Sequence, residues 1–456
     1  MKLYNTATKK IEALKPIKKG KINFFVCGPT VYDYSHIGHA KTYIQMDLLA
    51  RVLKANKFKV FYLQNITDID DKIILRAQQQ GIDWQQVGAK YEKAYYRDME
   101  SLNNAFVSQY VKATDYIDKI IRQVQKLIDK GFAYQTGDGI YFEIAKFKNY
   151  GKLSGRIEVK EDDAQSRIDA SEQKRGWNDF CLWKFSKPSE PVWESPFGKG
   201  RPGWHVEDTA ITESFFGGQY DIHGGAIDLI FPHHEAEIAQ MESISGISPC
   251  VHIWTHAGFL TIKGSRMGKS KENFVTIQDV LKKGYNPMSL RLLMLQSHYR
   301  SQIDFSWDLL DAAQNRLRDL QAFADLRWQA RKKTDKSLIP TLGTLKERFI
   351  AELSDDLNTP VAMSSLSDFI KAAMRTTISQ ADAGKFSDFI EFLDDVLGLK
   401  LGESQDISAD FYDLIEKREK ARKNKDWSES DKIRDILKGK GIEINDTDYG
   451  PIWSRT

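Results

Sequence analysis

CGPTVYDYSHIGH, residues 27–39, joins a segment with the pattern of a strand to a segment with the pattern of a helix. The apolar and aromatic run at 21–28 ends in Gly-Pro, which predicts a buried strand closed by a turn. A second short apolar strand is predicted at 60–63. Between the two strands, apolar residues recur at steps of four, as in an amphipathic helix: Ala40, Ile44, Leu48 and Val52.

Strand, glycine-containing turn, helix and strand form the opening βαβ unit of a doubly wound parallel sheet. We therefore expect an α/β fold with a catalytic domain of the Rossmann type, interrupted by an insertion and followed by an all-α C-terminal region. Changes in composition and in the periodicity of apolar residues along the chain predict five segments. They are the first half of the sheet domain at 1–104, the insertion at 105–202, the second half at 203–306, a helical bundle at 307–400 and a last region at 401–456.

The composition is typical of a folded globular protein. Hydrophobic residues make up 41% of the 456 residues and charged residues 28%. No apolar run reaches the roughly 18 residues that a membrane-spanning helix needs, and the N-terminus lacks the apolar core of a signal peptide. We expect a cytoplasmic protein without a membrane partner. The net charge of +3 is too small to indicate a nucleic-acid partner by itself.

Two histidines at the predicted helix start indicate an anion site. A helix N-terminus offers unpaired N–H groups and the positive end of the helix dipole, which suit phosphate. Gly38 allows the backbone to approach a bound nucleotide. His36 and His39 are one turn apart, so both side chains can reach the same anion. Taken alone, the motif is equally compatible with two surface histidines at the start of a helix.

His-Ile-Gly-His at 36–39 resembles the first signature of the class I aminoacyl-tRNA synthetases letter for letter. Their second signature, Lys-Met-Ser-Lys-Ser, is matched at 266–270 by Arg-Met-Gly-Lys-Ser, which departs at Arg266 and Gly268 but keeps Lys269. The resemblance implies that His36, His39 and Lys269 are catalytic. It assigns Lys269 to the α-phosphate, where a preorganised cation lowers the barrier to phosphoryl chemistry.

The order of further motifs is similar to that of the cysteinyl branch of this family, into the C-terminal region. The motifs are CGPTVYD at 27–33, NITDIDDK at 65–72, GRPGWH at 200–205, DIHGG at 221–225, FPHHEAE at 231–237 and DDLNTP at 355–360. The resemblance implies ATP-dependent activation of L-cysteine to cysteinyl-adenylate, with Mg²⁺ on the phosphates. Cysteine is then transferred to tRNA(Cys) for translation.

In that branch a zinc ion (Zn²⁺) is held by two cysteines, a histidine and a glutamate. Cys27, His233 and Glu237 match three of these positions, and the i, i+4 spacing of the last two places them on one side of a helix. The fourth position departs from the family pattern, because Asp208 stands where the family has cysteine. The resemblance implies a zinc site made of Cys27, Asp208, His233 and Glu237. The alternative is that Asp208 hydrogen-bonds nearby backbone and the site is weak or empty.

Zinc matters for the substrate, because a hydrophobic pocket gains only about 1–3 kcal/mol from a small difference in a side chain, whereas zinc binds a thiolate far better than a neutral hydroxyl. Other positions follow from the resemblance alone. They are the substrate contacts Thr67, Trp204 and His223, and the ATP contacts Gly28, Thr30, His36, Gly38, His39, Trp254, Met267 and Lys269. Cys181 and Cys250 match no ligand position and are expected to be buried thiols.

The resemblance assigns anticodon binding to residues 401–456. Residues 411–440 contain ten Lys or Arg against seven Asp or Glu, a mild basic excess that is also compatible with an ordinary solvated helix. Trp427, Tyr449 and Trp453 are candidates for stacking on unpaired bases. We expect a monomer.

Two other functions compete. A related ligase of mycothiol synthesis joins cysteine to an amino sugar, but it lacks the region that 307–456 supplies here. A non-enzymatic tRNA-binding relative would be expected to lose His36, His39 or Lys269, and all three are present.

Overall fold

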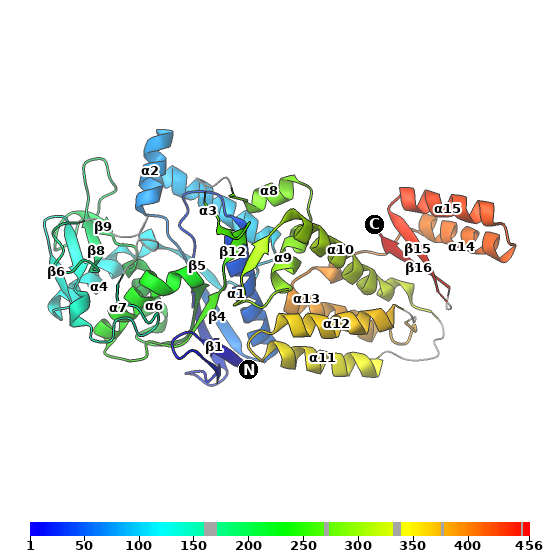
Figure 1. The fold of residues 1–456 in the computed structure, drawn as a ribbon, viewed down its shortest axis with the longest axis horizontal. Coiled ribbons are helices and arrows are strands. Elements are labelled where there is room, and N and C mark those ends of the chain that lie inside the picture. Colours follow the sequence, from blue (N-terminus) through cyan, green and yellow to red (C-terminus); the bar gives the residue numbers. More distant parts are fainter. Residues whose placement is uncertain (159–170, 269–272, 332–338, 375–377, 448–449) are drawn as a thin grey trace. The chain divides into compact units, whose positions relative to one another are not determined.

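The computed structural model describes residues 1–158, 171–268, 273–331, 339–374, 378–447 and 450–456. They form two compact units (Figure 1). The first unit contains Met1–Lys282 and Tyr299–Asp304, and the second contains Lys283–His298 and Phe305–Thr456. No helix within the described part of the chain is long and apolar enough to cross a membrane.

A five-stranded parallel sheet lies at the centre of the first unit, which confirms the predicted fold class. Its strand order is β11-β10-β3-β4-β5. Strand β3 is flanked by β4 on one side and by β10 on the other, so the chain winds outward from β3 in both directions. Ligands bind at such a switch point of parallel sheets. The strands span β3 Lys21–Val26, β4 Lys59–Ile66, β5 Gln109–Lys112, β10 Tyr220–Ala226 and β11 Val251–Ala257. Because β5 lies beyond residue 104, the sheet includes the start of the stretch assigned to the insertion.

Helix α1 (Ile37–Ala55) follows β3 and is buried on nearly all sides, so the expectation of an amphipathic helix is wrong. Lys41, a residue of the supposed polar face, is 1% exposed. Its ammonium group donates to the carbonyl oxygens of Gly258 at 2.6 Å and Ser301 at 2.5 Å. A buried cation is tolerated here because these carbonyl groups replace water. The sequence pattern did not reveal that partners existed on that side.

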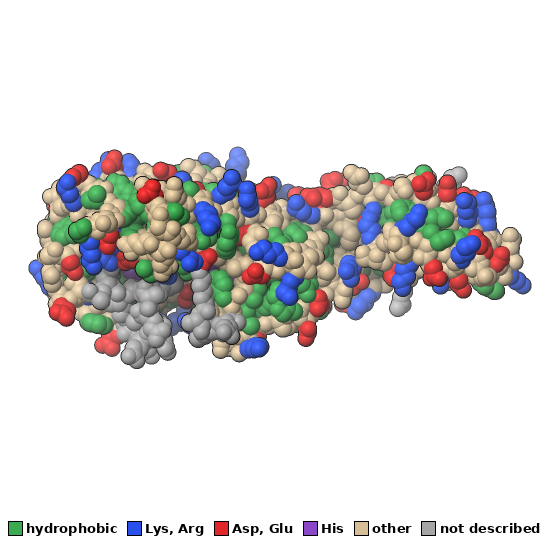
Figure 2. Space-filling view, turned by 90° about the horizontal axis from the view of Figure 1, so that it is seen from above, with side chains coloured by type: hydrophobic (Ala, Val, Ile, Leu, Met, Phe, Trp, Pro, Cys, Tyr) green, Lys and Arg blue, Asp and Glu red, His purple; other side chains and the backbone are tan. Residues whose placement is uncertain are grey.

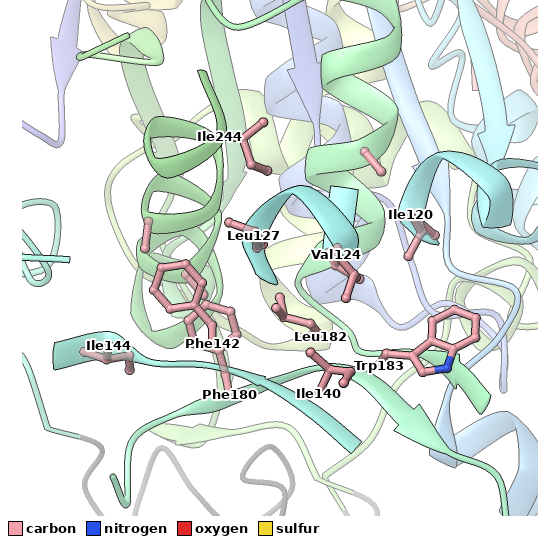
Figure 3. Packing of buried hydrophobic residues seen from close by; sticks show 14 of the residues in the cluster. Ile120, Val124, Leu127, Ile140, Phe142, Ile144, Phe180, Leu182, Trp183 and Ile244 are labelled. Carbon is pink, nitrogen blue, oxygen red and sulfur yellow. The ribbon is translucent and has the colours of Figure 1, made fainter. Parts of the chain in front are cut away.

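An antiparallel sheet of order β6-β7-β8-β9 occupies the chain between β5 and β10. Its apolar side packs on helix α4 (Ile117–Asp129), whose residues Ile120, Val124 and Leu127 lie on one helical face (Figure 3). The same core includes residues of α6 (Val206–Phe216) and α7 (Glu235–Ser245), so the insertion supports two helices that carry site residues. The strands are β6 Ala133–Gln135, β7 Gly139–Phe142, β8 Phe180–Phe185 and β9 Gly200–Pro202.

Smaller elements complete the first unit. Helices α2 (Asp71–Gln80) and α3 (Trp84–Ser101) connect β4 to β5, and α8 spans Ile277–Lys282. The N-terminal hairpin pairs β1 with β2, and a three-stranded sheet has the order β13-β12-β14. These strands span β1 Lys2–Asn5, β2 Lys10–Ala13, β12 Leu260–Ile262, β13 Ser265–Arg266 and β14 Ile303–Phe305.

The second unit is mainly helical, as expected, but it ends in a two-stranded hairpin. Ile442 and Ile444 are buried at a spacing of two, the strand periodicity that the sequence analysis overlooked. Trp453 in the second strand is 2% exposed and packs in the same small core. The elements are α9 Pro287–Leu295, α10 Trp307–Ala324, α11 Ile339–Leu353, α12 Thr359–Ala373, α13 Ala383–Leu397, α14 Ala409–Lys423, α15 Trp427–Gly439, β15 Ile442–Thr447 and β16 Gly450–Arg455.

Candidate active site and metal centre

A cavity of about 440 Å³ opens in the first unit where β3 gives way to α1. It brings together most of the positions expected to bind ATP and one expected substrate contact. The positions that line it are Cys27, Gly28, Thr30, His36, Gly38, His39, Trp204 and Met267. Its location beyond the carboxyl end of a parallel strand, at the start of a helix, is the usual ligand position in such folds.

His36 caps the N-terminus of α1. Its Nδ1 accepts hydrogen bonds from the backbone N–H groups of Gly38 at 3.1 Å and His39 at 3.3 Å. Burial lowers the pKa of His36 to about 4, although Asp228 opposes the shift. Since Nδ1 is an acceptor in a neutral ring, the proton resides on Nε2. His36 therefore contributes an N–H donor to the cavity wall without a positive charge.

His39 stacks on His36, with the ring centroids 3.8 Å apart and the planes 16° from parallel. Burial, followed by the neighbouring His36, lowers the pKa of His39 well below its ordinary value. Two neutral imidazoles at a helix start bind phosphate through hydrogen bonds and the helix dipole, not through ion pairs.

Met267, a described residue of the second signature, lies beside the histidine turn. A Cβ on Gly38 would be 2.8 Å from Nδ1 of His36 and 2.9 Å from Cε of Met267, so only glycine allows this approach. The backbone N–H of Ile37 donates to the carbonyl oxygen of Val275 at 3.0 Å, and that of Ile277 donates to Ser35 at 3.0 Å. Lys269 lies outside the described residues, so its assignment to the α-phosphate stays a prediction.

The four predicted metal ligands converge next to the cavity. Cys27 follows β3, Asp208 lies in the first turn of α6, His233 in the helical turn Ile230–His234, and Glu237 in α7. All four are buried, with at most 5% exposed. Asp208 Oδ2 is 3.0 Å from both Cys27 Sγ and His233 Nε2. His233 Nε2 is 3.3 Å from Cys27 Sγ and 3.5 Å from Glu237 Oε1.

The donor set fits a zinc ion. Zinc bonds of about 2.0–2.3 Å in a tetrahedron imply ligand–ligand distances of about 3.3–3.7 Å. The four measured distances, 3.0–3.5 Å, are close to that range. Neither carboxylate oxygen of Glu237 has a hydrogen-bond partner within the described chain. A buried carboxylate without a donor calls for a cation, and Asp208, His233 and Glu237 form a geometrically possible metal group.

Burial and the neighbouring acids favour the protonated forms of two of these groups, Cys27 and Glu237, when no metal is bound. Burial, followed by Asp208, raises the pKa of the Cys27 thiol well above its usual range. Burial, again followed by Asp208, raises the pKa of Glu237 as well. A bound divalent cation would reverse both shifts, because it favours the thiolate and the carboxylate.

His233 is oriented by two neighbours, His205, which the sequence analysis did not select, and Trp204, which it expected to contact the substrate. Its Nδ1 lies 2.8 Å from Nδ1 of His205, a hydrogen-bond distance that leaves Nε2 facing the other donors. The ring also stacks on Trp204, with centroids 4.2 Å apart. His205 stands in the quoted motif GRPGWH, so its position beside the metal-ligand motif was the available signal.

Three predicted positions lie behind the cavity wall. Among the described residues that line the cavity, Thr67, His223 and Trp254 do not appear. His223 Nδ1 is 2.7 Å from the Tyr220 hydroxyl, its Nε2 is 3.5 Å from Glu237 Oε2, and its ring stacks on Trp254. Their substrate and ATP contacts stay predictions. Cys181 and Cys250 are buried thiols, as expected, and Cys181 also contributes to the cavity wall.

We expect His36 to stay neutral down to about pH 5 and to half-titrate at about pH 4. The folded-state pKa lies below the unfolded one, so stability from this group is complete above about pH 6.5 and declines as the pH falls toward 4. NMR titration of the imidazole, assigned with His36→Gln, measures the midpoint. A midpoint close to 6.5 would contradict the buried, neutral assignment.

Gly38→Ala should lower the free energy of unfolding by about 1–3 kcal/mol, because its Cβ overlaps His36 and Met267. Gly343→Ala is the matched control, since nothing lies within 4 Å of its Cβ and it occurs inside helix α11. That change should raise stability by up to about 1 kcal/mol. Chemical denaturation of both variants provides the comparison, and equal effects would argue against the close approach at Gly38.

Known proteins resemble this chain along its whole length. Residues 13–315 match the family described as tRNA synthetases class I (C) catalytic domain, and residues 348–402 match the DALR domain. The chain is 43% identical to "Cysteine--tRNA ligase" of Thermoplasma acidophilum over 455 residues, covering 99% of this chain and 100% of the relative. It is 39% identical to "Cysteine--tRNA ligase" of Thermococcus onnurineus over 478 residues, covering 100% and 99%.

A solved structure shares the fold. Mycobacterium tuberculosis methionyl-tRNA synthetase in complex with methionyl-adenylate superposes with a TM-score of 0.62 at 15% identity, covering 84% of this chain and 92% of the other. The matches by sequence to these relatives cover 99–100% of this chain. The chain therefore belongs to the cysteine–tRNA ligases, a family of class I aminoacyl-tRNA synthetases.

Proposed function

We propose that this chain charges tRNA(Cys) with L-cysteine in two steps at the described cavity. A carboxylate oxygen of cysteine attacks the α-phosphorus of ATP, the bond to the bridging oxygen breaks, and pyrophosphate leaves. A ribose hydroxyl of the terminal tRNA adenosine then attacks the carbonyl carbon of the adenylate, and AMP leaves. The observation that supports this most directly is the set of possible metal ligands beside a cavity that begins at a helix N-terminus.

The nucleotide side of the reaction relies on groups that stabilise phosphate without changing protonation state. The Nε2–H group of neutral His36, the neutral ring of His39 and the amide dipoles at the start of α1 suit the phosphates. Gly28, Thr30 and Met267 belong to the same wall. We assign Lys269 to the α-phosphate and Mg²⁺ to the pyrophosphate oxygens, because negative charge grows there as the bond breaks.

The amino-acid side relies on the buried donors. Cys27, Asp208, His233 and Glu237 would hold Zn²⁺, which when bound supplies a site that prefers a thiolate over a hydroxyl. Trp204 lines the cavity and stacks on His233, so it can orient the substrate side chain against that site. We also assign Thr67 and His223 to substrate binding. His223 Nε2 lies 3.5 Å from Glu237 Oε2, and Thr67 Oγ1 lies 3.3 Å from Asn65 Nδ2, beside Asp208.

The tRNA side is assigned to 401–456. Trp427 at the start of α15 is 56% exposed, and Arg422 lies 5.8 Å from its ring centroid. An exposed aromatic ring beside a guanidinium suits an unpaired base. Trp453 is buried and Tyr449 lies outside the described residues, so Trp427 is the candidate that we retain. At the end formed by α14 and α15, basic and acidic side chains are interspersed, in keeping with a mild charge excess (Figure 2). We assign the enzyme to the cytoplasm as a monomer.

Cysteine-dependent ATP–pyrophosphate exchange should greatly exceed serine-dependent exchange in the wild-type protein and in Asp208→Cys. The preference survives because the substrate itself supplies the thiolate, whichever residue occupies position 208. The same purified samples should contain about one zinc ion per chain. Equal exchange rates with serine and cysteine would contradict the assigned role of the metal centre.

Trp427→Ala should reduce kcat/KM for tRNA(Cys) by about tenfold, because stacking on one base contributes roughly 1–3 kcal/mol. Cysteine-dependent exchange should be unchanged. Val361→Ala, an exposed apolar position of α12 outside 401–456, serves as the control and should leave both activities unchanged. Unaltered charging by Trp427→Ala would remove this residue from the tRNA interface.

A further inference from the structure

Asn65 is a fully buried amide in β4, directly beside the metal donors. Its Oδ1 accepts a hydrogen bond from the backbone N–H of Gly28 at 2.6 Å. Its Nδ2 donates to Asp208 Oδ1 at 2.6 Å and lies 3.3 Å from Thr67 Oγ1. The side chain thus connects the nucleotide turn to the one metal-ligand position where this chain departs from its family.

The orientation of the amide follows from its partners. The N–H of Gly28 can only donate, so the oxygen of the Asn65 amide must face it. The NH₂ group must then face Asp208. The two backbones pack closely at this point, because a Cβ on Gly28 would lie 1.7 Å from the carbonyl oxygen of Asn65.

The two oxygens of Asp208 consequently have different partners. Oδ1 is engaged by Asn65, whereas Oδ2 lies 3.0 Å from Cys27 Sγ and 3.0 Å from His233 Nε2. Without the amide, Oδ1 would be a buried acceptor lacking a donor, or the carboxylate would turn and present both oxygens to an ion. A hydrogen bond to a carboxylate is among the stronger ones, so the orientation is well fixed.

We propose that Asn65 is a positioning residue that makes Asp208 a one-oxygen metal ligand and so lets a carboxylate replace the family's thiolate. This rests on the proposed zinc centre. A carboxylate can offer either of two oxygens to a metal ion, whereas a thiolate at position 208 has a single donor atom. The thiolate therefore needs no hydrogen-bond partner to fix which atom faces the ion. The contribution of Asn65 to metal affinity should therefore depend on which residue occupies position 208, and that dependence is a measurable coupling.

The test is a double-mutant cycle on the full-length protein with Asn65→Ala and Asp208→Cys, read out as Zn²⁺ affinity by competition with a chromophoric chelator. In the wild-type background, Asn65→Ala should weaken Zn²⁺ binding by about 10–100-fold. In the Asp208→Cys background the same change should cost less than about threefold, because a thiolate has a single donor atom that needs no orienting partner. Any effect of the lost Gly28 contact is common to both backgrounds and cancels in the cycle.

Asn65→Ser is the second variant, in case the alanine variant does not fold. Its hydroxyl stands one bond short of the asparagine Oδ1 and Nδ2, so the contact with Asp208 is lost as in the alanine variant while a polar group remains, and the same coupling is expected. Thermal unfolding of each metal-free variant shows which pairs can be compared.

Equal losses of Zn²⁺ affinity in both backgrounds, or no loss in the wild-type background, would overturn the inference while leaving the zinc centre in place. A wild-type protein that binds no Zn²⁺ would overturn both the inference and the metal part of the proposed function. Cysteine-dependent exchange by that metal-free protein would then show that activation itself survives.

Discussion

The close approach of a thiol, two carboxyls and an imidazole is the constraint on which the rest of the structure depends. Asp208 Oδ2 and His233 Nε2 lie 3.0 and 3.3 Å from Cys27 Sγ, and His233 Nε2 lies 3.5 Å from Glu237 Oε1. Groups of this kind are costly to bury unless they are paired or bound to a cation. They come from three separate stretches of the chain, and two of the carriers, α6 and α7, pack into the core of the antiparallel insertion. The insertion therefore supports the metal donors, although it lies outside the parallel sheet.

The two halves of the chemistry meet at consecutive residues. Cys27 is a proposed metal ligand, whereas Gly28 donates its backbone N–H to Asn65 Oδ1 and lies in the turn that we propose binds the nucleotide. A shift of the backbone at this point would disturb thiol recognition and phosphate binding together. The contact Gly28–Asn65–Asp208 joins β3, β4 and α6 into one rigid unit, which is what a site that discriminates by one atom of its substrate requires.

Periodicity predicted the parallel sheet and the turn at 27–39, whereas the resemblance to a family singled out Cys27, His233 and Glu237, whose side chains the structure places close together. These features are local in sequence or belong to a recognisable motif. Asn65 and Asp208 are 143 positions apart, so nothing in the spacing indicates their contact. The full burial of α1 also escaped prediction, because the partners of Lys41 are carbonyl groups from distant segments. The hairpin after Gly441 is short and follows long helices, which hid its two-residue periodicity.

The central claim is that the four donors hold one ion that accepts the substrate thiol. X-ray absorption at the zinc edge of the zinc-loaded protein counts sulfur ligands directly. The account predicts one sulfur, from Cys27, in the protein alone, two after addition of L-cysteine, and still one after addition of L-serine. A sulfur count that does not rise with L-cysteine would contradict it.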